Sequence, residues 1–453
     1  MTRPLVFIVA VCALSVAAVR AARAAYGDIT LIGYLPLPTY TRITNVWGWV
    51  NPANGKEYAL VGDWNGGFYL VDVSNPAIPV EVTKVTGVPG FDLKPFGHYV
   101  YSCDGNSIGK DSRITDISNP ASPIVIPGAF NSAHTITIST RGHMYAELPG
   151  VTIYDVVADP ERPDSLYRII NQGHDSTWRH DRLYDFNGGA LNIWDVTNPA
   201  LPVYVGGDND PTVGYYHSGD ESADRNYLYV CDEYAVTPTP DIVIYNISNP
   251  ALPVRIGDIN DPTATVHQVY VVGNLMFVGY YTSGFKVFDL TNPATPVLAD
   301  AYDTSVYQTE ASPTAYAGAY NAYPFSPSGI VYVSDHPSGL YLFSVEGHTG
   351  NATGVRNGAA PSAVRLAQNF PNPFNPSTTI EFATESRAEV RLRIYGVDGT
   401  LVRTIVDSAL PAGSHTTRWD GTDERGRAVA SGVYYYRLDA GAASATRRMV
   451  LLK

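Results

Sequence analysis

The stretch IWDVTNPALPV, residues 193–203, decides the fold, because related copies recur along most of the chain. Most copies join an apolar strand to a turn of the form Ser/Thr-Asn-Pro-Ala-x-Pro, at a spacing of about 40 to 55 residues. The other copies are YLVDVSNPAIPV (69–80), ITDISNPASPI (114–124), IYDVVADPERP (153–163), IYNISNPALPV (244–254) and VFDLTNPATPV (287–297), with a shortened one, YLFSV, at 341–345. Such a period predicts an array of one repeated supersecondary unit.

Each unit resolves into four short strands, most clearly at HQVYVVG (267–273), LMFVGYY (275–281), GFKVFDL (284–290) and PVLADAY (296–302). A four-stranded unit of this length matches the blade of a β-propeller, and the third strands predict about seven blades. The last copy lacks a fourth strand. We therefore expect DITLIG, residues 28–33, to supply that strand and close the ring.

The composition sets the class of protein. The chain has 453 residues, 45% of them hydrophobic and 16% charged, and a formal net charge of −13. This balance disfavours binding to nucleic acid or to anionic membranes, which needs clustered Lys and Arg. Residues 1–25 read as a Sec signal peptide that ends in an Ala-x-Ala site, and we expect no transmembrane segment in the mature chain.

The repeats resemble the LVIVD family and the choice-of-anchor B proteins, whose propellers carry similar motifs. Those motifs are Trp47-Gly48-Trp49, the Asn-Pro-x-x-Pro tails and the segment from Tyr323 to Gly329. The resemblance covers about residues 28–346. It implies a surface-displayed propeller but no particular activity.

The C-terminal region follows a different pattern. Gly, Ala and Asn dominate 347–367, which predicts a linker, and short strands then alternate with Asp-Gly turns from NFPNPFNP (369–376) to RRMVLLK (447–453). This order resembles the type A sorting domain of type IX secretion, an immunoglobulin-like sandwich related to the hook-capping protein. The expected organisation is a signal peptide (1–25), a propeller (26–346), a linker (347–367) and a sorting domain (368–453). The alternative for the last domain is an accessory sandwich that only binds or spaces.

Two columns of polar residues follow from aligning the blades. Second strands end at Asp63, Asp104, Glu147, Asp185, Asp232, Tyr280 and Asp335, and first strands begin near Asn45, Asp92, His134, His174, His217, His267 and Asn321. Strand direction places both columns on one face of a propeller. His134, His174, His217 and His267, with Asp185 and Asp232, are therefore candidate ligands for a divalent cation, either Ca²⁺ or Zn²⁺. The alternative is that each polar group hydrogen-bonds a neighbouring loop and closes its own blade.

Three functions remain open at this stage. Tyr216 and Tyr281 belong to a set of tyrosines expected at the same rim, where aromatic rings stack on a glycan or peptide. This pattern favours a binding or adhesion module over a metal-dependent hydrolase or lyase, and over a purely structural surface protein. The sequence contains no H-E-x-x-H motif and no phosphate-binding loop. Cys103 and Cys231 fall at equivalent places in distant blades, which predicts two free, buried thiols.

Overall fold

The computed structural model describes residues 27–349 and 364–452, with short gaps at 39–41, 106–111, 128–129, 132, 149, 171–172, 235–239, 305–315, 367–368, 370, 385–387, 397–399, 412 and 441–442. The predicted signal peptide lies outside the described residues, as does most of the predicted linker. The chain divides into two compact units between residues 358 and 359. The described elements are all β-strands.

The first unit consists of four-stranded antiparallel sheets, here called blades 1 to 7. Blade 1 comprises β2 (Ile43–Val50), β3 (Glu57–Asp63), β4 (Phe68–Asp72) and β5 (Val80–Val85). Blade 2 comprises β6 (Asp92–Phe96), β7 (Tyr99–Cys103), β8 (Arg113–Asp116) and β9 (Ile124–Val125). Blade 3 comprises β10 (Ile136–Ile138), β11 (His143–Glu147), β12 (Val151–Asp155) and β13 (Asp164–Ile169). Blade 4 comprises β14 (Asp175–Arg179), β15 (Arg182–Phe186), β16 (Leu191–Asp195) and β17 (Val203–Asp208).

The remaining blades repeat this order. Blade 5 comprises β18 (Tyr216–Glu221), β19 (Tyr227–Asp232), β20 (Ile242–Asn246) and β21 (Val254–Ile259). Blade 6 comprises β22 (Gln268–Val272), β23 (Leu275–Gly279), β24 (Phe285–Asp289) and β25 (Val297–Tyr302). Blade 7 comprises β26 (Ala319–Tyr323), β27 (Val331–Asp335), β28 (Gly339–Val345) and β1 (Ile29–Pro36).

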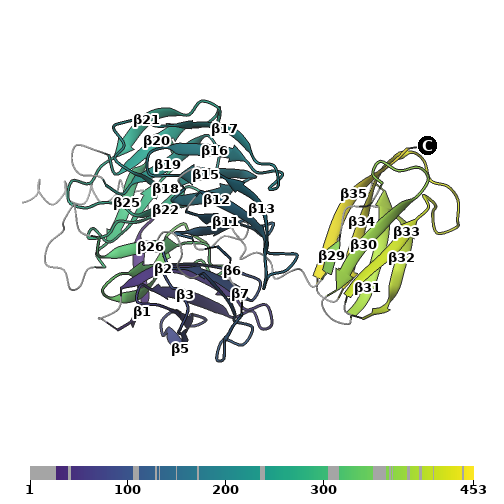
Figure 1. Ribbon diagram of the computed structural model, residues 1–453, viewed down its shortest axis with the longest axis horizontal. Coiled ribbons are helices and arrows are strands. Elements are labelled where there is room, and N and C mark those ends of the chain that lie inside the picture. The colour runs from purple at the N-terminus through teal and green to yellow at the C-terminus, as the bar shows by residue number, and fades with distance from the viewer. Residues whose placement is uncertain are drawn as a thin grey trace, which may run out of the picture. The chain divides into compact units, whose positions relative to one another are not determined.

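The first strands of the blades form a closed inner ring. Each of β2, β6, β10, β14, β18, β22 and β26 contacts the first strand of the next blade, and β26 returns to β2. In Figure 1 the fourth strands β5, β13, β17, β21 and β25 lie toward the outside of this unit. The expected propeller of seven blades is therefore confirmed.

The N-terminal strand completes the last blade, as the sequence predicted. β1 pairs antiparallel with β28, from Ile29 opposite Val345 to Pro36 opposite Gly339. Strands from the two ends of the propeller sequence therefore share one sheet. This arrangement pairs the free edge that blade 7 would otherwise expose.

The Asn-Pro repeat forms the turn between the third and fourth strands of a blade. In blade 4 the Asp195 carboxylate accepts the backbone N–H of Thr197 at 2.8 Å, and the Asn198 side chain accepts that of Ala200 at 3.2 Å. The same pair of bonds recurs in blade 6 through Asp289 and Asn292. Asp and Asn are frequent in such turns because their side-chain oxygens replace the missing backbone partner.

Small residues allow the blades to pack closely. Cys103 and Cys231 are both buried and free, which agrees with the two buried thiols that the repeat alignment predicted. A Cβ on Gly279 would lie 2.7 Å from the backbone oxygen of Tyr320 in the next blade. Large side chains at this column would push neighbouring blades apart.

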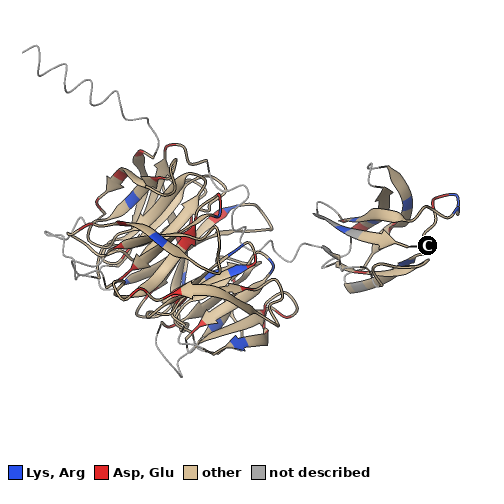
Figure 2. Ribbon diagram, turned by 90° about the horizontal axis from the view of Figure 1, so that it is seen from above, with Lys and Arg blue, Asp and Glu red and all other residues tan. Residues whose placement is uncertain are grey.

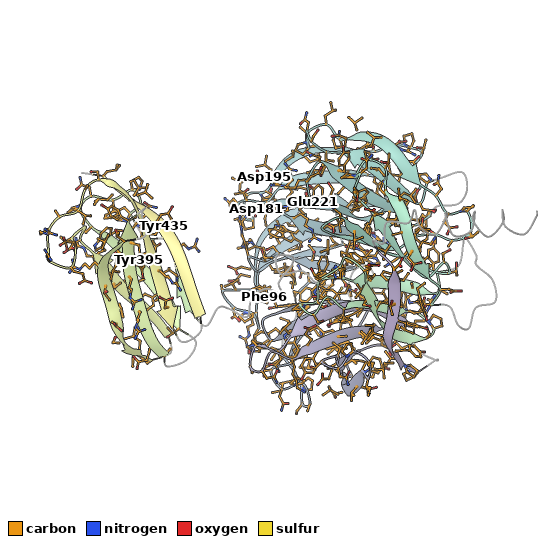
Figure 3. All side chains as sticks on the ribbon, turned by 180° about the vertical axis from the view of Figure 1, so that it is seen from behind. Phe96, Asp181, Asp195, Glu221, Tyr395 and Tyr435 are labelled. Carbon is orange, nitrogen blue, oxygen red and sulfur yellow. The ribbon has the colours of Figure 1, made fainter. Side chains whose placement is uncertain are left out.

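The second unit is a sandwich of two antiparallel sheets, β29-β30-β33 and β32-β31-β34-β35. Its strands are β29 (Val364–Leu366), β30 (Thr378–Thr384), β31 (Ala388–Gly396), β32 (Leu401–Leu410), β33 (Gly413–Trp419), β34 (Gly432–Ala440) and β35 (Ala443–Leu451). Trp419, Leu392 and Tyr436 are buried between the sheets. On β31 and β34, Tyr395 lies opposite Tyr435 (Figure 3).

The sandwich begins earlier than expected. β29 falls inside the stretch predicted as linker, yet it pairs with β30 from Val364 opposite Thr384 to Leu366 opposite Phe382. Its three residues are too few to show a strand period in the sequence. Among the described residues, no helix has the length and apolar character needed to cross a membrane.

Candidate functional site

A pocket of about 550 Å³ opens at the end of the propeller where the first strands begin. His134, His174, His217 and His267 all line it. Each precedes or opens the first strand of its blade, in blades 3 to 6. The equivalent positions of the other blades hold Asn45, Asp92 and Asn321, which line the same pocket.

The four histidines form a continuous arc of rings, here called the imidazole arc. Ring centroids lie 4.3 Å apart for His134 and His174, 4.7 Å for His174 and His217, and 4.6 Å for His217 and His267. Tyr320 extends the arc, at 3.8 Å from His267. Four residues separated by 133 positions in the chain are thus brought into one wall, because each occupies the same place in successive blades.

One nitrogen of most of these rings is used to join the blades. His217 Nδ1 lies 2.9 Å from the His267 carbonyl oxygen, and His267 Nδ1 lies 2.8 Å from that of Tyr320. His134 Nδ1 bonds the carbonyl of Gly105. A carbonyl can only accept, so Nδ1 carries the hydrogen and donates it.

His174 is the exception, since its buried Nδ1 makes no hydrogen bond of normal geometry with the described residues. In the bonded rings the neutral imidazole leaves Nε2 as a lone-pair donor. The bonded rings of the arc therefore join neighbouring blades, which is close to the structural role given above as the alternative to metal binding. The arc also leaves ring nitrogens available to a ligand.

Burial keeps several of these rings uncharged. Burial lowers the pKa of His174 to about 2, with His217 and His134 adding to the effect. It also lowers the pKa of His134 and places that of His267 well below the usual value. The pKa of Asp175 is raised to about 6, again mainly by burial.

The other side of the pocket mouth is closed by direct side-chain bonds, here called the amide bridge. The Asn321 amide donates to Asn45, and the Asn45 amide donates to Asp92. Lys94 pairs with the Asp92 carboxylate at 2.7 Å, and the backbone N–H of Ile136 donates to it at 2.8 Å. Donors from blades 1, 2, 3 and 7 therefore join at one buried network.

Glu233 contributes the carboxylate nearest to the arc. Its Oε2 lies 3.5 Å from His217 Nε2, and its Oε1 accepts a 2.7 Å hydrogen bond from the Tyr281 hydroxyl. Tyr281 has a φ of 35°, which is unusual for a residue with a side chain, and two backbone bonds to Ala319 hold it there. The structure thus fixes the Tyr281 hydroxyl on Glu233.

Aromatic rings form a collar around the pocket entrance. Trp64 is 44% exposed, Tyr234 is 51% exposed and Tyr316 is 38% exposed, although all three line the pocket. Trp64 packs edge-on against Phe91 at 5.0 Å, and Arg42 lies over its ring at 5.3 Å. These three exposed rings, hereafter the aromatic collar, offer flat apolar faces to a ligand above the arc.

The structure separates the residues predicted from sequence into two groups. His134, His174, His217, His267 and Tyr281 line the pocket, whereas Asp185, Asp232 and Tyr216 do not. The Asp232 carboxylate instead accepts backbone N–H groups of Tyr215 and Tyr234, at 2.8 and 3.1 Å. The residues next to Asp232 and Tyr216 do line the pocket, namely Glu233 and Tyr215.

Asp185 and Tyr216, which do not line the pocket, also bond other residues of the propeller. Asp185 is fully buried, lies 3.2 Å from the Asn192 amide, and helps to raise the pKa of Glu147 well above its usual range. The Tyr216 hydroxyl bonds Tyr245 at 2.9 Å and Asp208 at 3.1 Å. Asp185 is therefore held inside the propeller and the Tyr216 hydroxyl joins blades 4 and 5, so the expectation that they lie at the pocket mouth is corrected.

Among the charged residues at the other end of the first strands and hairpins, Arg179 lines the pocket, whereas Asp181, Asp195 and Glu221 do not. In Figure 3, Phe96, Asp181 and Asp195 lie along one edge of the propeller; Phe96 ends β6, Asp195 ends β16 and Glu221 ends β18. Glu221 binds the ring of His180 and accepts a 2.6 Å hydrogen bond from Tyr184. Figure 2 shows acidic and basic residues interspersed over the propeller.

Several pocket residues were missed by sequence reasoning, namely Glu233, His336, Trp64, Phe91 and Arg179. The position of His336 could have been predicted, because it directly follows Asp335, the acid that ends β27. In the structure its Nδ1 bonds the Ile43 carbonyl of blade 1. Glu233 likewise follows Asp232. Both lie one residue beyond the aligned column.

Three side chains come close enough to hold a metal ion. His217, Glu233 and His267 each offer a donor atom, and these atoms lie within 4.8 Å of one another. Of the four histidines predicted as candidate ligands, His217 and His267 belong to this group, and His134 and His174 do not. The described residues supply two imidazoles and one carboxylate.

The comparisons with known proteins agree with the architecture. Residues 55–87, 92–127 and 265–304 match the LVIVD repeat, and residues 374–444 match the FlgD Ig-like domain. The repeat matches fall on blades 1, 2 and 6. LVIVD repeats are thus found in the β-propeller, and an FlgD Ig-like domain is found in the second unit. The search of curated proteins found no match.

Three solved structures to which the chain is similar are distant from it in sequence. PorZ, described as a surface component of the type IX secretion system of Porphyromonas gingivalis, is 11% identical with a TM-score of 0.35. The match covers 87% of this chain, which spans only 64% of that structure. U3-55K is 11% identical (70% of this chain, 98% of that one), and Saccharomyces cerevisiae Sqt1 is 9% identical (71% and 99%). Both have a TM-score of 0.47.

Proposed function

We propose that this protein is an exported bacterial surface protein whose propeller binds an extracellular glycan without transforming it. The observation that carries the proposal is the aromatic collar, in which Trp64, Tyr234 and Tyr316 remain exposed around a concave pocket. Exposed apolar rings lose ordered water when a flat apolar partner covers them, and the faces of sugar rings are such partners. Polar groups of the amide bridge and the imidazole arc would fix the orientation of the glycan hydroxyls.

A glycan array probed with the full chain tests this proposal. We expect a defined set of glycans to bind, with affinity reduced up to about tenfold in Trp64→Ala, since an aromatic stacking contact contributes about 0.5–1.5 kcal/mol. Tyr204→Ala is the matched control, because Tyr204 is exposed on the outer strand of blade 4. Equal binding by both variants, or no glycan bound by the unsubstituted chain, would exclude the collar as a glycan site.

The C-terminal sandwich is proposed to deliver the propeller to the cell surface through type IX secretion after Sec export. Its similarity to the hook-capping domain and its basic, apolar ending support this role. In a bacterium with this secretion system, a chain that ends at residue 358 should remain in the periplasm. Surface display of the truncated chain at the level of the full chain would contradict the proposal.

A metal-dependent hydrolase or lyase is the second candidate, favoured by the grouping of His217, Glu233 and His267 within the pocket. A divalent ion there could polarise a bound oxygen or activate water. This candidate predicts that bound glycans are cleaved when Zn²⁺ is added and remain intact in its absence. Intact glycans under both conditions would exclude this candidate, and only the binding function would remain.

A further inference from the structure

The strongest unassigned feature of the propeller is the set of donor atoms at the junction of blades 5 and 6. His217 belongs to β18, Glu233 follows β19, and His267 directly precedes β22. All three line the pocket. The two imidazoles and one carboxylate come from rigid strand ends, which hold ligand geometry better than long loops.

Both imidazoles are oriented as metal ligands usually are. In metal sites the ring nitrogen that does not bind the ion generally donates to a carbonyl or carboxylate, which fixes the tautomer. His217 Nδ1 donates to the His267 carbonyl, and His267 Nδ1 donates to the Tyr320 carbonyl. Nε2 is therefore the lone-pair atom of each neutral ring. No described residue donates a hydrogen bond to either Nε2.

Glu233 supplies the negative charge. Tyr281 holds one carboxylate oxygen at 2.7 Å, while the other lies 3.5 Å from His217 Nε2. No Lys or Arg among the described residues forms an ion pair with this carboxylate, although its side chain is only 15% exposed. A buried carboxylate is stabilised by a nearby cation, and a metal ion would fill that role.

The spacing suits a small transition-metal ion. Ligand atoms around tetrahedral zinc lie roughly 3.3 Å apart, given bonds of about 2.0 to 2.2 Å. The His217 to Glu233 separation of 3.5 Å is close to this value, and the whole set lies within 4.8 Å. Two imidazoles favour Zn²⁺ over Ca²⁺, which prefers six or more oxygen ligands.

We propose that His217, Glu233 and His267 form a Zn²⁺ site with one coordination position open to the pocket. Three protein ligands leave the fourth position of a tetrahedral zinc ion free, and a ligand oxygen could fill it. The open position faces the space where a glycan would lie beneath the aromatic collar. This site does not depend on the proposed glycan binding, because the collar residues are not among its ligands.

Substitution by Asn gives a matched test. The Asn side chain can donate a hydrogen bond from the place of Nδ1, as Asn45 and Asn321 do at the equivalent positions of other blades, but it lacks Nε2. Zn²⁺ binding to the metal-free full chain is measured by titration calorimetry for His217→Asn, His267→Asn and Glu233→Gln. His134→Asn is the control within the arc, and His98→Asn is the control outside the pocket.

The expected result is one Zn²⁺ per unsubstituted chain, no measurable Ca²⁺ binding, and affinity on the order of 100-fold lower in each of the three ligand variants. Both controls should bind as the unsubstituted chain does. The proposal is overturned by the absence of stoichiometric Zn²⁺, or by ligand variants that bind normally. Equal loss in His134→Asn would also overturn it, since the ion would then be shared by the whole arc. Glycan-array binding by the metal-free unsubstituted chain distinguishes failure of this site from failure of the proposed function.

Discussion

The two halves of the pocket mouth use one position of the repeat in different ways. In blades 7, 1 and 2 this position holds Asn321, Asn45 and Asp92, whose side chains bond one another in the amide bridge. In blades 3 to 6 it holds the imidazole arc, in which His134, His217 and His267 reach neighbouring backbone carbonyls through Nδ1. The amide side chains bond directly to side chains of the neighbouring blades and so help to close the propeller. A histidine closes it with one nitrogen and keeps the second for a ligand.

The largest expected effect comes from breaking the amide bridge at Asp92. Asp92→Ala should lower the free energy of unfolding by about 3–5 kcal/mol, because Lys94 and the Asn45 amide would lose a buried charged partner. Denaturant unfolding followed by tryptophan fluorescence measures it. Lys56→Ala breaks the more exposed ion pair with Asp72 and should cost no more than about 1 kcal/mol. Similar losses in both variants would show that the bridge does not hold the blades together.

Zinc should stabilise the imidazole side selectively. At a free Zn²⁺ concentration of 100 times Kd, a ligand that binds only the folded state adds about 2.7 kcal/mol to the free energy of unfolding. We expect this gain in the unsubstituted chain and its loss in His267→Asn, measured in the same unfolding experiment. A gain of equal size in both would place the ion elsewhere.

The pH dependence of stability tests the histidine on the amide side. Burial lowers the pKa of His336 to about 4, below its unfolded value of about 6.5. As the pH falls from about 6.5 toward 4, the unfolded chain takes up a proton that the folded chain does not, so folding stability is lost. At pH 5 this loss is about 2 kcal/mol relative to pH 7.

His336→Asn should remove that share of the acid destabilisation while its amide still donates to the Ile43 carbonyl. Unfolding curves at pH 7 and pH 5 for both chains provide the measurement. An unchanged pH slope in the variant would mean that His336 ionises normally in the folded protein.

The smallest effect is expected at His174. Its Nδ1 is buried without a hydrogen bond of normal geometry, and it is not among the proposed zinc ligands. His174→Asn should therefore change the free energy of unfolding by less than about 1 kcal/mol and leave Zn²⁺ affinity unaltered. A large loss of either would give His174 a role that its contacts do not explain.

Much of the fold could be predicted from the repeats. The Asp and Asn of each tail specify the turn between the third and fourth strands, and the missing tail after YLFSV predicted that β1 completes blade 7. The histidine column could also be placed near one face, because equivalent positions of successive blades lie side by side.

At two positions the predicted site residue is the direct neighbour, in sequence, of the residue that lines the pocket. Side chains alternate in direction along a strand, so Tyr216 is buried in blade 5 while Tyr215 lines the pocket. Where β19 ends, Asp232 turns back to bind loop N–H groups and Glu233 reaches the arc. The path of a chain leaving a strand follows no sequence period, and the aligned column therefore selected the wrong acid.

The most direct test of the account is an anomalous difference map recorded at the zinc absorption edge from crystals of the full chain grown with Zn²⁺. The account predicts one strong peak on the imidazole side of the pocket, about 2.0–2.2 Å from His217 Nε2, His267 Nε2 and a Glu233 oxygen. A map with no peak at this position, or with its strongest peak on the amide side, would contradict the division of the pocket into a closing half and a ligand-binding half.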